Sequence, residues 1–204
     1  MLDSSAIRTQ PTTEVGNWRA SAGDHHNIDA PQVADIEGTL ASAGVLLLVV
    51  LAVTRVAAPA AFARVRTEVQ GQGVALGAVV AVLATAASLW WSEGAHFPPC
   101  ELCWYQRIAM YPLAGILLLA AVRRDRAVRP YGLLLAGGGL AVSLWHNYVE
   151  TFPERHSGGC DPTNPCTIRW VEGLGFWTIP RMAAVCFTLV LVFLLLDAPP
   201  KEPA

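Results

Sequence analysis

Two pairs of cysteines are the residues of this chain best suited to chemistry. Cys100 and Cys103 form a C-x-x-C just before a long apolar run, and Cys160 and Cys166 lie close together further along the chain. Thiols at these spacings can close a disulfide or share a metal ion, so a redox centre and a metal site are both open at this point. The fifth cysteine, Cys186, lies inside an apolar run, and we interpret it as a small hydrophobic residue.

The composition of the chain indicates a membrane protein with several spans. Hydrophobic residues make up 53% of the 204 residues and charged residues only 15%, which is too apolar for an ordinary soluble domain. The net charge of -2 is close to neutral, and the basic residues form no patch interleaved with aromatic residues. We therefore expect no nucleic acid as a partner.

Apolar runs predict the elements that must position the cysteines. Four runs have about the length that a helix needs to cross a bilayer, and we predict spans over 74–91, 104–122, 131–148 and 178–196. A shorter run over 39–54 can be extended to 63, which predicts an extra N-terminal helix that either spans the membrane or lies on its surface.

These runs divide the chain into four parts. We predict a polar, disordered tail over 1–38, the extra helix over 39–63, a four-helix core over 74–196 and a cytoplasmic tail over 197–204. The fold class that we expect is therefore an all-α membrane protein, a four-helix transmembrane bundle with one additional N-terminal transmembrane or interfacial helix.

The distribution of lysine and arginine predicts the orientation of the bundle. Basic residues gather in the connectors at one side of the predicted spans, at Arg55, Arg64, Arg66, Arg123, Arg124, Arg126 and Arg129, with Lys201 in the C-terminal tail. Such connectors face the cytoplasm. The connectors over 92–103 and 149–177 are much poorer in basic residues, so both cysteine pairs are predicted on the outer, oxidising side.

That placement favours redox chemistry over a zinc site, which would need all four thiols reduced. The short C-x-x-C loop stabilises a fold little, but it can open and close without refolding the chain. We expect a helix that starts at Trp104 to favour a thiolate at Cys103, and Arg107 to stabilise that thiolate or the charge on a bound electron acceptor. A non-catalytic metal-binding membrane protein with the same four thiols is the alternative.

The residues around the cysteines also carry a resemblance. The run PCELCWYQRIAMYP at 99–112, followed by Cys160, by CTIRW at 166–170 and by GFWTIP at 175–180, resembles the disulfide bond formation protein B (DsbB) family. The resemblance is to the shorter-loop, Gram-positive-like type, and Gln106 stands where some members carry a glutamate. A vitamin K epoxide reductase-like enzyme also joins a helical bundle, a C-x-x-C and a quinone, but the order of the two pairs fits the DsbB family better.

The resemblance implies a quinone-dependent protein-dithiol oxidase in the bacterial cytoplasmic (inner) membrane, with its cysteines facing the periplasm or cell exterior. Electrons would pass from a reduced DsbA-like thioredoxin-fold protein to Cys160 and Cys166, then to Cys100 and Cys103, and on to ubiquinone or menaquinone. A Cys100–Cys166 bridge is the implied intermediate, and Cys103 is the residue that would contact the quinone beside Arg107. We expect His146 to contact the quinone or to donate a proton, because quinone reduction takes up two protons. No metal is expected.

Overall fold

The computed structural model of the protein describes residues 30–155, 160 and 164–197. Six α-helices lie in this part of the chain: α2 (Ala30–Ala57), α3 (Pro59–Val69), α4 (Gly73–Leu89), α5 (Glu101–Arg123), α6 (Arg129–Thr151) and α7 (Ile179–Leu196). A π-helical turn, η2 (Trp90–Gly94), extends α4, and a 3-10 turn, η3 (Pro153–Arg155), follows α6. Apart from one isolated bridge between Gly173 and Trp177, the described residues contain no β-structure.

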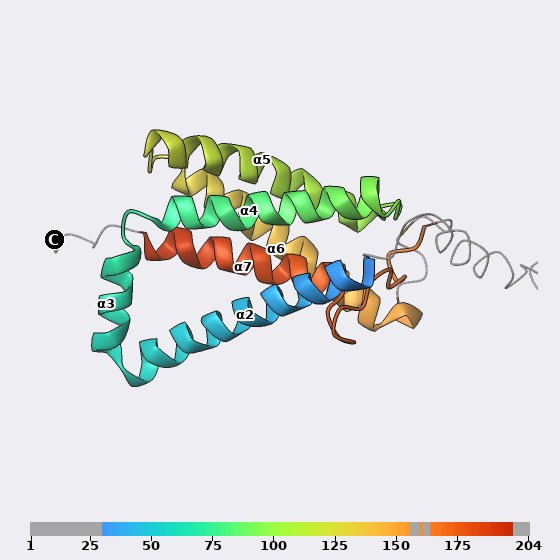
Figure 1. The fold of residues 1–204 in the computed structure, drawn as a ribbon, viewed down its shortest axis with the longest axis horizontal. Helices are drawn as coiled ribbons and strands as arrows, with labels where there is room; N and C mark the ends of the chain where they lie inside the picture. The colour runs from blue at the N-terminus through green and yellow to red at the C-terminus, as the bar shows by residue number, and fades with distance from the viewer. Residues whose placement is uncertain (1–29, 156–159, 161–163, 198–204) are drawn as a thin grey trace, which may run out of the picture.

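Helices α4, α5, α6 and α7 form a bundle in which each helix packs against two others (Figure 1). Fully buried side chains of α5 and α7, among them Leu113, Leu117, Phe187, Val190 and Leu194, fill its centre. Helix α2 lies along the outside of α7 and continues through α3 into α4. The predicted fold class, a four-helix bundle with an additional N-terminal helix, is confirmed.

Four helical stretches of the described chain are long and apolar enough to cross a membrane: α2, α4 with η2, α5 and α7. Helix α6 matches the predicted span over 131–148 in position and is as long as α5, but it does not meet the same criterion. Polar residues in its last turns lower its hydropathy. His146 is buried, and Asn147 donates from Nδ2 to the carbonyl oxygens of Ser143 and Pro180 at 2.8 and 2.9 Å, so the Asn147 amide N–H groups are bonded inside the protein.

The predicted boundary between tail and first helix is corrected, because α2 begins at Ala30 and not at residue 39. Polar residues in its first turns have distant partners. The Glu37 carboxylate accepts from the Trp91 indole N–H at 2.8 Å, and the Asp35 carboxylate accepts from the backbone N–H of Leu174 at 2.9 Å. Residues 1–29 and 198–204 of the predicted tails lie outside the described residues.

The extra helix predicted over 39–63 is two helices. Helix α2 ends at Ala57, and α3 starts afresh with Pro59 in its first turn. Proline has no N–H to continue the helical ladder and its ring clashes with the preceding turn, so the chain changes direction here.

Candidate redox site

Cys100 caps the N-terminus of α5. Its backbone is extended, and its Sγ accepts a hydrogen bond from the backbone N–H of Cys103 at 3.3 Å. Pro98 and Pro99 keep the preceding chain out of a helix, and the helix begins at Glu101. Our expectation of a helix starting at Trp104 is therefore corrected, and the helix N-terminus serves the sulfur of Cys100 rather than that of Cys103.

The two sulfurs of the C-x-x-C are in contact. Cys100 Sγ and Cys103 Sγ lie 2.6 Å apart, so the two thiols are placed to form a disulfide with each other. Cys100 is buried, whereas Cys103 is partly exposed. The two residues of the pair therefore differ in burial, and Cys103 is the more accessible of the two.

His146 of α6 lies against the buried sulfur. Its Nε2 is 3.7 Å from Cys100 Sγ and 3.1 Å from the carbonyl oxygen of Cys166, and its Nδ1 is 3.1 Å from the amide nitrogen of Gln106. The amide nitrogen can only donate and the carbonyl can only accept, so the neutral ring carries its proton on Nε2. That N–H points at the place where the two cysteine pairs meet.

These contacts favour a thiolate at Cys100. The hydrogen bond from the Cys103 thiol, the hydrogen bond from His146 and the backbone N–H of Cys103 together lower the pKa of Cys100 to about 5, although burial opposes the shift. The surroundings of Cys100 therefore favour its thiolate in the reduced protein.

The second pair lies in the same cluster as the first. Cys160 and Cys166 form a disulfide with their Cα atoms 6.0 Å apart. Cys166 is buried together with Cys100 and Val149, and Cys103 and Cys160 pack against them. The four cysteines that the sequence singled out are thus brought together, while Cys186 lies among the apolar residues packed on the bundle core.

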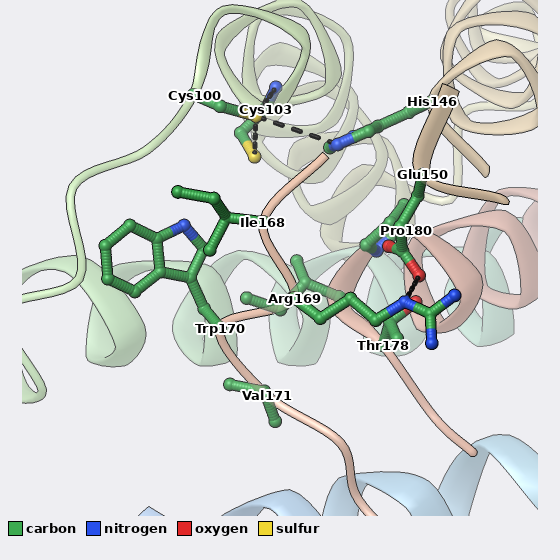
Figure 2. Close-up of a pocket in the computed structure, with 11 residues that line it drawn as sticks. Cys100, Cys103, His146, Glu150, Ile168, Arg169, Trp170, Val171, Thr178 and Pro180 are labelled. Carbon is green, nitrogen blue, oxygen red and sulfur yellow. Dashed lines mark hydrogen bonds and ion pairs between the residues drawn. The ribbon is translucent and has the colours of Figure 1, made fainter. Parts of the chain in front are cut away.

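Two side-chain contacts hold the segment that carries Cys166. Asn164 donates from Nδ2 to the carbonyl oxygens of Pro98 and Pro99, at 3.3 and 3.1 Å. Arg169 Nε lies 3.1 Å from Glu150 Oε1, and Figure 2 shows this pair beside the cysteines. The Glu150 side chain is 2% exposed, which makes this ion pair the most buried charge contact described at the site.

Sequence reasoning did not identify Glu150 or Arg169. Glu150 lies four residues after His146, so both project from one face of α6, and this spacing is the signal that could have found it. A small cavity of about 20 Å³ separates the first cysteine pair from Glu150, with Thr178 also in its wall (Figure 2). That space suits one water molecule among polar groups.

Arg107 lies on the side of α5 that faces α4, away from His146 on α6. Its Nε and Nη2 donate to the hydroxyl and carbonyl oxygens of Ser88 on α4, at 3.0 and 2.9 Å. Its guanidinium carbon is 5.4 Å from the centroid of the Trp104 ring. Arg107 therefore reaches towards α4, whereas His146 comes from α6, and the two residues predicted at one quinone lie on different sides of α5.

The geometry of the first pair is less suited to a metal. Cys100, Cys103 and His146 could offer three donor atoms within 4.8 Å of one another. Two zinc–sulfur bonds of about 2.3 Å in a tetrahedral site would hold the sulfurs roughly 3.8 Å apart, well beyond the 2.6 Å between Cys100 and Cys103. Cys160 and Cys166 are joined to each other, so the arrangement favours thiol–disulfide exchange.

A helical membrane bundle with two cysteine pairs in one cluster at its end defines a membrane protein of thiol–disulfide exchange. Comparison with known families agrees. The sequence profile of the disulfide bond formation protein DsbB matches residues 70–196, and the chain belongs to this family of membrane disulfide oxidases. The matched region contains all four cysteines of the cluster, while α2 and α3 precede it.

Several curated proteins are similar to this chain. A "Probable disulfide formation protein" of Oceanobacillus iheyensis is 45% identical over 121 residues, which cover 58% of this chain and 83% of the relative. "Disulfide bond formation protein C" of Bacillus subtilis is 42% identical over 120 residues, 58% of this chain and 86% of the relative. No solved structure shows a significant match to the chain. The resemblance inferred from the cysteine motifs is confirmed.

Proposed function

We propose that this protein is a membrane thiol:quinone oxidoreductase that re-oxidises a DsbA-like, thioredoxin-fold dithiol protein outside the cytoplasm. The observation that carries the proposal is the shared cluster, in which Cys100 packs with Cys166 and contacts Cys103. Exchange between the two pairs then needs only small movements.

The first exchange takes place at the second pair. A thiolate of the partner attacks Cys160, which breaks the Cys160–Cys166 disulfide and forms a mixed disulfide. The second thiol of the partner resolves that bond, so the partner leaves with a disulfide and Cys160 and Cys166 are left as thiols. Two electrons have entered the protein.

The second exchange moves those electrons to the first pair. Cys166 attacks Cys100, which breaks the Cys100–Cys103 disulfide, forms the Cys100–Cys166 bridge and releases Cys103 as a thiolate. Cys160 then attacks Cys166, which restores the Cys160–Cys166 disulfide and releases Cys100. The N–H groups of Cys103 and His146 stabilise Cys100 as a leaving group, since a thiol with a lowered pKa leaves faster.

The residues near Cys103 fit a quinone, either ubiquinone or menaquinone. When bound, the quinone would accept two electrons and two protons. Cys103 is partly exposed, and Trp104 and Ile108 present apolar surface that is 52% and 63% exposed. Arg107, held by Ser88, supplies hydrogen-bond donors beside them. His146 as a quinone contact stays a prediction; its buried contacts favour proton donation at Cys100 instead.

The site has a natural orientation in a bacterial cytoplasmic membrane. The arginines at the ends of α2, α3 and α5 lie at the end of the bundle remote from the cysteines. By the positive-inside rule, the end with the arginines faces the cytoplasm. The cysteines would then face the periplasm or cell exterior, where a dithiol partner can reach them.

Turnover by the purified protein tests this proposal. Full-length protein in lipid nanodiscs with a quinone should oxidise a reduced thioredoxin-fold protein catalytically, and Cys100→Ser or Cys103→Ser should abolish turnover. Cys186→Ser, remote from the cluster, is the matched control and should keep it. Full turnover in both Cys100→Ser and Cys103→Ser would contradict the relay, and near-stoichiometric zinc with four reduced thiols would favour the metal-binding alternative.

A further inference from the structure

Helix α2 lies close to α7 at one end and diverges from it at the other. At Gly38 and Gly44, side chains of Trp177, Val185 and Leu189 come within 3.0 Å of the place that a Cβ would occupy. A Cβ at either position would make these contacts unusually tight, so the two glycines favour this close approach. Beyond Gly44, α2 runs away from α7 towards α3, and the three helices form a wedge (Figure 1).

The wedge contains a cavity of about 430 Å³, at the end of the molecule remote from the cysteines. Its walls are mainly aliphatic, with Leu48 and Leu51 from α2 and Val192 and Leu195 from α7. This volume lies within the range of ligand sites in proteins. Because α2 and α7 are both membrane-spanning candidates, the walls stand where hydrocarbon chains are the surrounding solvent.

Two arginines close the apolar walls at one end. Arg55, in the last turn of α2, and Arg66, in the last turn of α3, both line the cavity. Phe62 lies between them in sequence, with its ring centroid 6.0 Å from the guanidinium carbon of Arg55. A ligand that satisfies this lining joins a hydrocarbon chain to an anionic head, and the membrane itself supplies such molecules.

We propose that the cavity between α2, α3 and α7 binds one anionic membrane phospholipid. Its phosphate lies between Arg55 and Arg66, and an acyl chain runs along Leu48, Leu51 and Val192. A quinone has a neutral head group and gives no reason for two cations at the mouth. The site is independent of the redox relay, since it lies at the other end of the bundle.

Lipid binding to the purified full-length protein tests the proposal. Native mass spectrometry should show binding of phosphatidylglycerol in preference to phosphatidylcholine with the same acyl chains. Arg55→Gln and Arg66→Gln should each weaken phosphatidylglycerol binding about fivefold, and the double variant about thirtyfold. These factors correspond to the binding energy that one basic residue contributes near an anionic lipid surface, counted once for each arginine. Arg64→Gln, an exposed arginine of the same helix α3 outside the cavity lining, is the matched control and should bind as the wild type does.

A second variant tests the apolar half of the site with both arginines intact. Ala52 lines the cavity, so Ala52→Trp should occupy it and exclude the lipid, while an unchanged Cys160–Cys166 disulfide and thermal midpoint report an intact fold. Equal phosphatidylglycerol binding by the wild type and the Arg55→Gln/Arg66→Gln variant would overturn the proposal. Equal losses in Arg64→Gln, or retention of quinone in place of phospholipid, would overturn it as well.

Discussion

The Glu150–Arg169 ion pair allows a quantitative test of how the second cysteine pair is held. Arg169→Ala leaves the Glu150 carboxylate, 2% exposed, without its cationic partner. Removing one partner of a fully buried pair costs about 3–5 kcal/mol. The Arg169 side chain is 42% exposed, so water replaces part of the contact. We therefore expect a loss of about 2 kcal/mol in unfolding free energy, between the exposed and the buried cases.

Thermal unfolding of the detergent-solubilised protein measures this loss. At roughly 2–4 °C per kcal/mol for a chain of this size, Arg169→Ala should lower Tm by about 4–8 °C. Arg169 follows Cys166 by three residues, so oxidation of the dithiol partner should slow as well. Glu172→Gln is the matched control, because Glu172 contacts the same arginine at 3.4 Å but is 50% exposed, and we expect a change within about 0.5 kcal/mol.

A double variant separates the buried charge from lost packing. Glu150→Gln/Arg169→Met removes both charges, so no ion stays buried without a partner, and we expect it to recover much of the loss seen in Arg169→Ala. The reasoning is refuted if Glu172→Gln lowers Tm as much as Arg169→Ala does, or if the double variant is less stable than Arg169→Ala.

Two further predictions concern the first cysteine and the bundle core. With a pKa of about 5 for Cys100, the ultraviolet absorbance of the Cys100 thiolate in the reduced protein should level off above about pH 6, a readout that does not need a reagent to reach this buried sulfur. His146→Ala should move that profile to higher pH, and an unmoved profile would contradict the assigned contact. Because the native pKa lies below the ordinary thiol value of 9.0, the thiolate stabilises the reduced fold fully above pH 9, and this contribution is lost as the pH falls to 5. Gly139→Ala would place a methyl group against the ring of Phe187, so we expect the unfolding free energy to fall by about 1–3 kcal/mol, measured by thermal unfolding. Gly138→Ala is the control, because a methyl group there meets no neighbour and should not lower the stability. Equal thermal midpoints for the two variants would contradict the packing of Phe187 on Gly139.

Features that depend on neighbouring residues could be predicted from the sequence. Apolar runs of membrane length predicted α4, α5 and α7 because lipid leaves a chain few alternatives to a helix. The spacing of Cys100 and Cys103 predicted a redox pair, but the exact start of α5 was missed by a few residues. That difference moved the helix N-terminus from one sulfur to the other.

Features that depend on distant residues could not be predicted in this way. Glu150 in the last turn of α6 is one of several carboxylates before α7, and although its spacing from His146 places it near the site, nothing in the sequence around Arg169 shows that Glu150 is the one that Arg169 contacts. The sequence predicted a polar tail where α2 begins, because the hydrogen-bond partners of Asp35 and Glu37 are 139 and 54 residues away along the chain. A polar side chain is unfavourable in a membrane helix only until its partner is known.

The hydrogen bonds from α2 to Trp91 and Leu174 bear on any attempt to reduce this protein to a minimal version. A chain trimmed to the region that matches the family would leave the indole N–H of Trp91 without its acceptor, and this side chain is 4% exposed and stacked on Phe97. It would also leave the Leu174 amide without its carboxylate. A compact disulfide-forming version would therefore need two new hydrogen-bond acceptors, for Trp91 and Leu174, and apolar residues packed on the face of α7 that α2 now contacts.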